Sequence, residues 1–230
     1  MPPLTPRSAG LDEGVRLAWA NPDDFDRGRA LHLLGNAERA RAVATTHPGL
    51  RDRFLLGRML LRDLAAAAGG MRSEAVEVTA ACERCGAEHG RPRLRWSDVA
   101  SKPPAASLAS CGHLVVAVIA PAGVAVGVDV EPARVPREAD TARRRAIVEL
   151  LGGTPRTAVR RWVRAEAALK ADGRGLRIEP GRIVFETRGS RDGVTAHLPG
   201  TATVYDLIDR RIEGCLVSVA VARPTPSLVR

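Results

Sequence analysis

A chain of 230 residues is long enough to form one domain or two small ones, and either can bury an apolar core. Its net charge of +9 favours an anionic partner, but aromatic residues make up only 3%, too few to stack well on single-stranded nucleic acid. No apolar run is long enough to span a membrane, and the first residues lack a signal-peptide pattern. We therefore expect a cytoplasmic protein with reduced cysteines that binds neither nucleic acid nor membrane.

Helices prevail in the first part of the predicted order. Residues 26–44 are rich in arginine, alanine and leucine and predict a helix that is interrupted near Gly35. Pro48 suits the first turn of a longer helix, and the glycines at 69 and 70 suit its end. Strands are predicted at residues 15–19 and 75–80, and residues 1–10 are predicted to be loose.

A turn-rich loop follows, with two cysteines and a histidine spaced C-x-x-C-x-x-x-H at Cys82, Cys85 and His89. This spacing supplies three ligands of a zinc site, but a closed tetrahedral site needs four, and no fourth ligand stands nearby in the sequence. The alternative is a tight turn with free thiols. The sequence leaves both readings open.

Strands and two helices fill the second part. Residues 114–120 and 124–131 are apolar and joined by Pro-Ala-Gly at 121–123, which predicts a β-hairpin. Helices are predicted at residues 142–151 and from residue 161 to Gly173. Further strands are predicted at residues 182–187, 201–207 and 216–222, with a glycine-rich connection at 189–200 and a frayed tail from residue 224.

The strand at residues 124–131 ends in two acids one residue apart. Because side chains alternate between the faces of a strand, Asp129 and Glu131 lie on one face. Two carboxylates on one face repel each other unless a positive group lies between them. A divalent metal such as Mg²⁺ or Mn²⁺ suits hard oxygen ligands, and the alternative is a solvated edge strand with an acidic outer face.

The helix that begins at residue 161 contains a third acid and one of the chain's two lysines. Trp162, Glu166 and Lys170 are spaced i, i+4, i+8 and therefore form one line along the helix. Lys102 and Lys170 are the only lysines in an arginine-rich chain, and a lysine binds phosphate as a flexible point charge. This line predicts a site that joins Glu166 and Lys170 to the acids of the strand.

Gly127-Val128-Asp129-Val130-Glu131, followed by Trp162, Glu166 and Lys170, resembles the 4′-phosphopantetheinyl transferases of the type that activates surfactin synthetase. The resemblance implies an α+β fold built as a pseudo-twofold pair of similar α+β halves, with the active site in the cleft between them. The halves would be residues 1–124, which bind the nucleotide of coenzyme A, and residues 125–230, which carry the metal and catalytic residues. Similar stretches at 112–121 and 214–224 agree with two related halves.

The resemblance also implies a role for each matching residue. The family moves the phosphopantetheine arm of coenzyme A onto a serine of an acyl or peptidyl carrier protein, such as those of polyketide, peptide or fatty-acid synthesis. Glu166 and Lys170 would be catalytic, and a monomer is expected from the two internal halves. Mg²⁺ would be held by Asp129, Glu131 and Glu166. Coenzyme A would be held by Arg41, Arg53, Arg91, Ser110, Cys111 and Lys170.

Two positions depart from the family pattern. Ser110 stands where the family has a histidine, and Ala165 stands where it has a lysine before the glutamate. Each loss of a charge-assisted hydrogen bond costs about 1.5–3 kcal/mol. The alternative is therefore a protein of the same fold that has lost or changed the transferase activity and binds carrier protein or a coenzyme A thioester. A basic nucleic-acid-associated or zinc-knuckle protein is a third hypothesis.

Overall fold

The computed structural model describes residues 6–82, 85–96, 102–134, 138–188 and 193–223, with residues 138–140, 176 and 188 described by their backbone alone. The chain divides into two compact units, Met1–Gly123 and Val124–Arg230. In the described residues these units contain five α-helices and three antiparallel sheets, so the predicted α+β class is confirmed. No helix among the described residues is both long and apolar enough to cross a bilayer.

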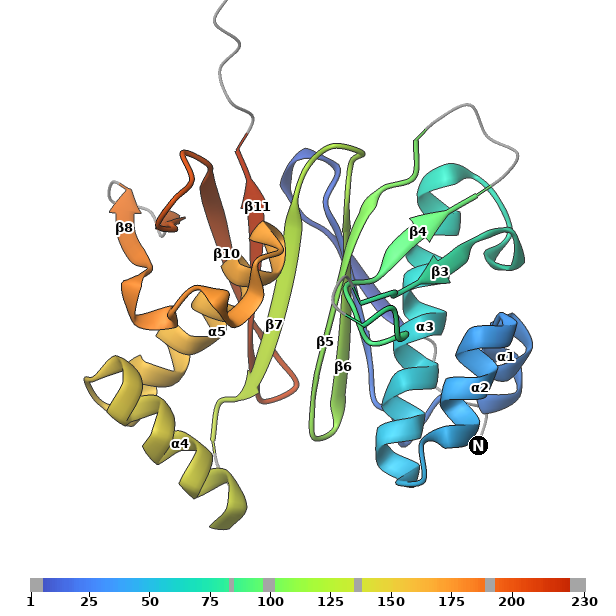
Figure 1. The fold of residues 1–230 in the computed structure, drawn as a ribbon, viewed down its shortest axis with the longest axis horizontal. Helices are drawn as coiled ribbons and strands as arrows, with labels where there is room; N and C mark the ends of the chain where they lie inside the picture. The colour runs from blue at the N-terminus through green and yellow to red at the C-terminus, as the bar shows by residue number, and fades with distance from the viewer. Residues whose placement is uncertain (1–5, 83–84, 97–101, 135–137, 189–192, 224–230) are drawn as a thin grey trace, which may run out of the picture. The chain divides into compact units, whose positions relative to one another are not determined.

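Unit 1 (Met1–Gly123) contains a four-stranded sheet in the order β1-β2-β6-β5, a two-stranded ribbon β3-β4, and three helices (Figure 1). The strands are β1 (Arg7–Gly10), β2 (Arg16–Ala20), β3 (Glu77–Thr79), β4 (Arg93–Arg95), β5 (Ala105–Cys111) and β6 (Leu114–Ala120). The helices are α1 (Arg27–Leu33), α2 (Asn36–Ala44) and α3 (Pro48–Gly69). Helix α3 packs its leucine-rich face against β6 and β2, which forms the core of this unit.

The helix ends of unit 1 follow from capping residues. Pro48 occupies the first turn of α3, His47 Nδ1 accepts a hydrogen bond from the Leu50 amide, and Gly70 ends the helix with a φ of 66°. The predicted interruption near Gly35 is confirmed. There the Glu38 carboxylate accepts a hydrogen bond of 3.0 Å from the Gly35 amide, which starts α2 as a separate helix.

Unit 2 (Val124–Arg230) contains a five-stranded sheet in the order β7-β11-β10-β9-β8, with helix α5 packed on β7 and β11 (Figure 1). The strands are β7 (Val126–Pro132), β8 (Val184–Arg188), β9 (Gly193–His197), β10 (Val204–Ile212) and β11 (Cys215–Ala222). The helices are α4 (Glu138–Leu151) and α5 (Pro155–Asp172). Short 3₁₀ turns are found at Asp12–Gly14, Ser73–Ala75, Gly175–Arg177 and Pro180–Arg182.

The predicted hairpin over residues 114–131 is wrong. Strand β6 is central in its sheet, where β2 and β5 already occupy both of its edges, so it has no edge left for β7. Strand β7 pairs with β11 instead. The hairpin around this position is β5–β6, which turns at Gly112 and His113.

Smaller corrections concern segments of weak strand character. Strand β1 falls within residues 1–10, which were predicted to be loose, and β9 falls within the connection at 189–200. Strand β5 was not predicted, because alanine and serine dominate its sequence and neither favours a strand. Its pairing with β6 decides its conformation. Residues 1–5 and the tail from residue 224 lie outside the described residues.

The two units share a pattern of strand pairing. In unit 1, β2 pairs antiparallel with β6, the second strand of the β5–β6 hairpin. In unit 2, β7 pairs antiparallel with β11, the second strand of the β10–β11 hairpin. In each unit a long helix, α3 or α5, lies between these strands in sequence and packs on the sheet.

Candidate metal and phosphate site

The acidic strand faces helix α5. A Cβ built on Gly127 would overlap the Ala167 carbonyl and the Ala171 amide, so the side of β7 to which Gly127 belongs touches the backbone of α5. Asp129 and Glu131 lie on this same side because side chains alternate along a strand. Glycine at 127 therefore allows the close approach that brings both acids under the helix.

Helix α5 presents the other predicted residues. Thr154 caps its start, Pro155 occupies its first turn, and Gly173 ends it with a φ of 88°. Trp162 packs against α4 with Ile147 and Leu151. One and two turns further along the same line lie Glu166, half-buried, and Lys170.

Lys170 reaches the acidic strand directly. Its Nζ donates to Asp129 Oδ1 at 2.6 Å and to the Val128 carbonyl at 3.1 Å. The Asp129 side chain is 11% exposed and that of Lys170 is 32% exposed. The strand and the helix therefore share one charged cluster, with Lys170 as the contact between them.

A second cation reaches this cluster from α4. Arg143 Nη2 donates to Glu131 Oε1, and the arginine side chain is 59% exposed where the glutamate is 11% exposed. Sequence reasoning missed this residue, since nothing distinguishes Arg143 from Arg144 and Arg145, which follow it on the same helix.

The cluster holds more acids than bases, and the pKa shifts reflect this excess. Burial raises the pKa of Asp129 even though Lys170 opposes the shift. Burial raises the pKa of Glu131 in the same way, with Arg143 opposing it. For Glu166, burial and then the charge of Asp129 raise the pKa, so these carboxylates share one electrostatic environment. Burial lowers the pKa of Arg143, but Glu131 outweighs it and the net shift is upward.

The carboxylates fit a hard divalent cation in their chemistry. Asp129 Oδ2 is buried and has no hydrogen-bond partner, which leaves a desolvated acceptor that a cation would satisfy. Among the described residues, one ligand atom from each of Cys82, Cys85 and His89 lies within 4.8 Å of the other two. The carboxylate oxygens of Asp129, Glu131 and Glu166 do not lie as close together as this. A Mg²⁺ ion there would keep water ligands, as it commonly does, or would draw the side chains inward.

Apart from Lys170, which lies in unit 2, the residues predicted to bind coenzyme A form two groups within unit 1. Arg53 donates to the Gly49 carbonyl at 3.1 Å and approaches the Gly112 carbonyl at 3.5 Å, beside the turn that follows Ser110 and Cys111. Ser110 is exposed and Cys111 is half-buried.

The second group surrounds the loop between β3 and β4. Arg41 donates to the Glu88 carbonyl and lies over the Phe54 ring at 4.7 Å from its centroid. Arg91 follows Glu88 by three residues in the same loop and is half-buried.

The departure at Ala165 has a structural counterpart. This residue is fully buried in the core of unit 2, so a lysine there would need a different packing of α5. Its neighbour Arg164 pairs with Asp209 on β10 through bonds of 2.9 and 2.6 Å. Arg164 therefore does not supply the missing charge to the acidic cluster.

Comparisons with known proteins add no relative to this picture. No protein-family model matches the chain, and a search of curated proteins found no match. The functional argument therefore depends on the motifs of the sequence and on the cluster formed by β7, α4 and α5.

Proposed function

We propose that the protein is a Mg²⁺-dependent 4′-phosphopantetheinyl transferase that modifies a serine of an acyl or peptidyl carrier protein. The observation that carries this proposal is the placement of Asp129 and Glu131 on the face of β7 that touches α5, the helix with Glu166 and Lys170. A strand motif and a helix motif that are about thirty residues apart in sequence thus belong to one cluster. We further propose that it acts as a cytoplasmic monomer.

A pairing pattern common to the two units supports the proposed pseudo-twofold fold. In the pairs β2–β6 and β7–β11 the later strand also pairs with the strand just before it in the chain, and α3 and α5 lie between the paired strands in sequence. The sheets differ in that β2 also pairs with β1, whereas β7 is an edge strand. Duplication of one α+β half would produce this correspondence. In this proposal unit 1 binds the nucleotide of coenzyme A, and unit 2 carries the chemistry.

The reaction forms a bond between the serine oxygen and the phosphorus next to the pantetheine arm. It breaks the pyrophosphate bond, so that adenosine 3′,5′-bisphosphate leaves with the electron pair. A bound Mg²⁺ would neutralise the charge that develops on the pyrophosphate oxygens. Asp129, Glu131 and Glu166 would hold it.

Two residues would act on the reacting groups directly. Lys170, whose side chain is 32% exposed, can exchange Asp129 for a phosphate oxygen and steady the leaving group. Glu166 would take the serine proton, directly or through water.

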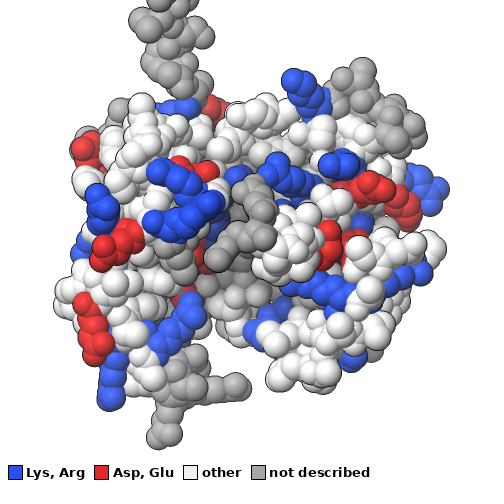
Figure 2. Space-filling model, viewed as in Figure 1, with Lys and Arg blue, Asp and Glu red and all other residues white. Residues whose placement is uncertain are grey.

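The phosphates of the nucleotide suit the arginines of unit 1. Arg41 and Arg91 lie at the loop between β3 and β4, and Arg53 lies at the β5–β6 turn. Guanidinium groups bind phosphate through paired hydrogen bonds. Basic side chains are spread over the face drawn in Figure 2 and mixed with acidic and uncharged ones, and such a surface also suits an acidic carrier protein.

The test is a mass measurement. The purified protein is incubated with coenzyme A, Mg²⁺ and a panel of apo carrier proteins, and a mass gain of one phosphopantetheine is expected on at least one of them. Glu166→Gln is expected to abolish the gain, whereas Glu179→Gln, an exposed acid outside the cluster, is expected to retain it. No gain on any carrier protein would contradict the proposal.

A second candidate function follows from Ser110 and Ala165. A protein of this fold that lacks both the histidine and the lysine would bind coenzyme A or a carrier protein without transfer. The two losses together would slow the transfer by about a hundredfold or more if each removes one charge-assisted hydrogen bond. Coenzyme A binding without turnover, unchanged by Glu166→Ala, would favour this candidate.

A further inference from the structure

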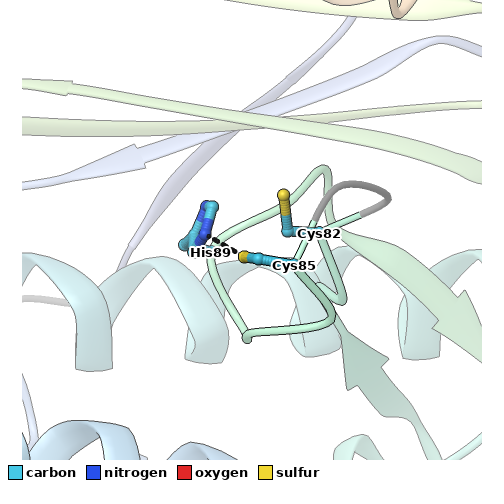
Figure 3. Close-up of side chains that lie close together, drawn as sticks. All are labelled: Cys82, Cys85 and His89. Carbon is cyan, nitrogen blue, oxygen red and sulfur yellow. Dashed lines mark hydrogen bonds between the residues drawn. The ribbon is translucent and has the colours of Figure 1, made fainter.

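The loop between β3 and β4 gathers three soft or borderline metal ligands. One ligand atom from each of Cys82, Cys85 and His89 lies within 4.8 Å of the other two. Figure 3 shows the three side chains on one loop, with the Cys85 sulfur pointing toward the His89 ring at 3.0 Å from Nε2. Neither cysteine is in a disulfide.

The backbone of this loop holds the ligands in place. The Cys82 amide donates to the Ala87 carbonyl and the Gly86 amide donates to the Cys82 carbonyl, both at 2.8 Å. Gly86 has a φ of 72°, a conformation that glycine adopts without strain. These bonds tie the backbone of Cys82 to the two residues that follow Cys85, and the C-x-x-C spacing is typical of one half of a zinc site.

The base of the loop is fixed as well. The Gly90 amide donates to the Ala80 carbonyl at 2.5 Å, and the Glu88 carboxylate accepts a bond of 2.8 Å from the Ala80 amide. A Cβ at position 90 would meet the Ala81 carbonyl oxygen at 2.5 Å, so only glycine allows this approach. These bonds keep His89 close to the two cysteines.

The distances suit a tetrahedral zinc ion. With Zn–S of about 2.3 Å and Zn–N of about 2.0–2.1 Å, a tetrahedron separates two sulfurs by about 3.8 Å and a sulfur from a nitrogen by about 3.6 Å. Both separations are below the 4.8 Å within which the three ligand atoms lie, and the 3.0 Å between Cys85 Sγ and His89 Nε2 would lengthen by about 0.6 Å when the ion binds. Thiolate and imidazole ligands favour zinc over Mg²⁺, so this cluster and the acidic cluster select different ions.

We infer that Cys82, Cys85 and His89 bind one Zn²⁺ ion, with water or an added small ligand as the fourth partner. Cys85 and His89 are exposed, so the fourth position is open to solvent. Two thiolates balance the charge of the ion, and the site closes the tip of a ribbon whose strands β3 and β4 pair over only three residues each. Its main role is therefore to stiffen this loop.

The loop also contains groups that the proposed function assigns to coenzyme A. The Glu88 carbonyl of this loop accepts a hydrogen bond from the Arg41 guanidinium, and Arg91 lies two residues after His89. Zinc would hold both arginines in position. Only the use of these arginines to bind coenzyme A depends on the proposed transferase activity. Zinc binding itself requires neither coenzyme A nor Mg²⁺, so the two proposals can fail separately.

The test uses the full chain, stripped of metal with a chelator under reducing conditions and then titrated with Zn²⁺ or Co²⁺. One equivalent of zinc is expected by elemental analysis. Cobalt is expected to give thiolate charge-transfer absorption and the strong visible bands of a tetrahedral site. Cys82→Ser, Cys85→Ser and His89→Gln are each expected to weaken zinc binding by about tenfold or more.

Matched controls separate these ligands from other thiols and imidazoles. Cys111→Ser and the exposed His32→Gln are expected to keep one equivalent of zinc. Substoichiometric zinc in the reduced chain would overturn the inference, as would equal zinc binding by the three ligand variants. Circular dichroism of the stripped variants shows whether the fold has been retained, so that lost binding can be attributed to the ligand.

Discussion

The described residues of each unit include a buried cluster of charges, and these two clusters differ in how completely the acids are paired. In unit 1 the carboxylate of Glu38 accepts from Arg62 at 3.2 and 2.5 Å and from the Gly35 amide, and Arg58 lies 3.2 Å away. The side chains of Glu38, Arg58 and Arg62 are all 3–4% exposed. Both oxygens of this carboxylate are paired, as in a cluster that holds helices together, although Arg58 Nε and Arg62 Nε are buried without a hydrogen bond.

The cluster of unit 2 is open by comparison. Asp129, Glu131 and Glu166 share two cations, Lys170 and Arg143, and Asp129 Oδ2 is buried without a partner. The acids are the groups in excess here. In unit 1, by contrast, burial and then the charges of Arg41 and Arg62 lower the pKa of Arg58 to about 10. An unsatisfied buried acid weakens a fold, and the proposed Mg²⁺ ion would satisfy this oxygen.

The largest expected effect is on the closed cluster. Glu38→Ala leaves Arg58 and Arg62 buried without a counter-charge and is expected to lower the free energy of unfolding by about 3–5 kcal/mol. Urea denaturation measures it. Asp52→Ala is the control because it breaks the Arg27–Asp52 pair, whose arginine is 48% exposed, and is expected to cost less than about 1 kcal/mol. Equal losses in both variants would mean that the buried cluster is not what holds α2 to α3.

The next largest effect is expected in unit 2, where a substitution should lower activity and raise stability. Glu166→Gln is expected to reduce transfer to the carrier protein by about a hundredfold or more, while the melting temperature of the metal-free protein rises. The rise is expected because burial and Asp129 disfavour the charged glutamate, as its raised pKa shows. Steady-state transfer rates and thermal melts measure the two effects, with Glu179→Gln unchanged in both. A variant with lower stability and full activity would reverse the assignment of the clusters.

How much of these clusters follows from the sequence depends on the range of the interaction. The i, i+4, i+8 line of Trp162, Glu166 and Lys170 and the shared face of Asp129 and Glu131 follow from local periodicity. Arg143 does not, because its pairing with Glu131 depends on how α4 packs against the sheet.

The prediction of strand pairing from the sequence has the same limit. The apolar stretch of β6 was evident, but its partners were not, since β2 and β5 compete with the adjacent β7 for its edges. Lys170 was expected to join the acids of the strand, and its contact with Asp129 confirms this. Its expected contact with phosphate stays a prediction.

A smaller effect concerns Mg²⁺. Because the open cluster has excess negative charge, Mg²⁺ at about ten times its dissociation constant is expected to stabilise the wild-type protein by about 1.4 kcal/mol. Asp129→Asn is expected to lose this stabilisation, and Glu179→Gln to keep it. Thermal melts at constant ionic strength measure it, with NaCl as the matched salt. Equal stabilisation by NaCl would mean that the acids attract ions without binding one.

The smallest effect connects the zinc loop of unit 1 to the proposed reaction. His89→Gln is expected to raise the KM for coenzyme A by about three- to tenfold, with kcat nearly unchanged, because a looser loop positions Arg41 and Arg91 less well without changing the acids of unit 2. His32→Gln should leave both constants unchanged, and added zinc should restore the stripped wild-type protein but not the variant. A fall in kcat at constant KM would mean that the loop acts in the chemical step. That result would contradict this prediction, because the contact of Glu88 with Arg41 connects the loop to coenzyme A binding alone.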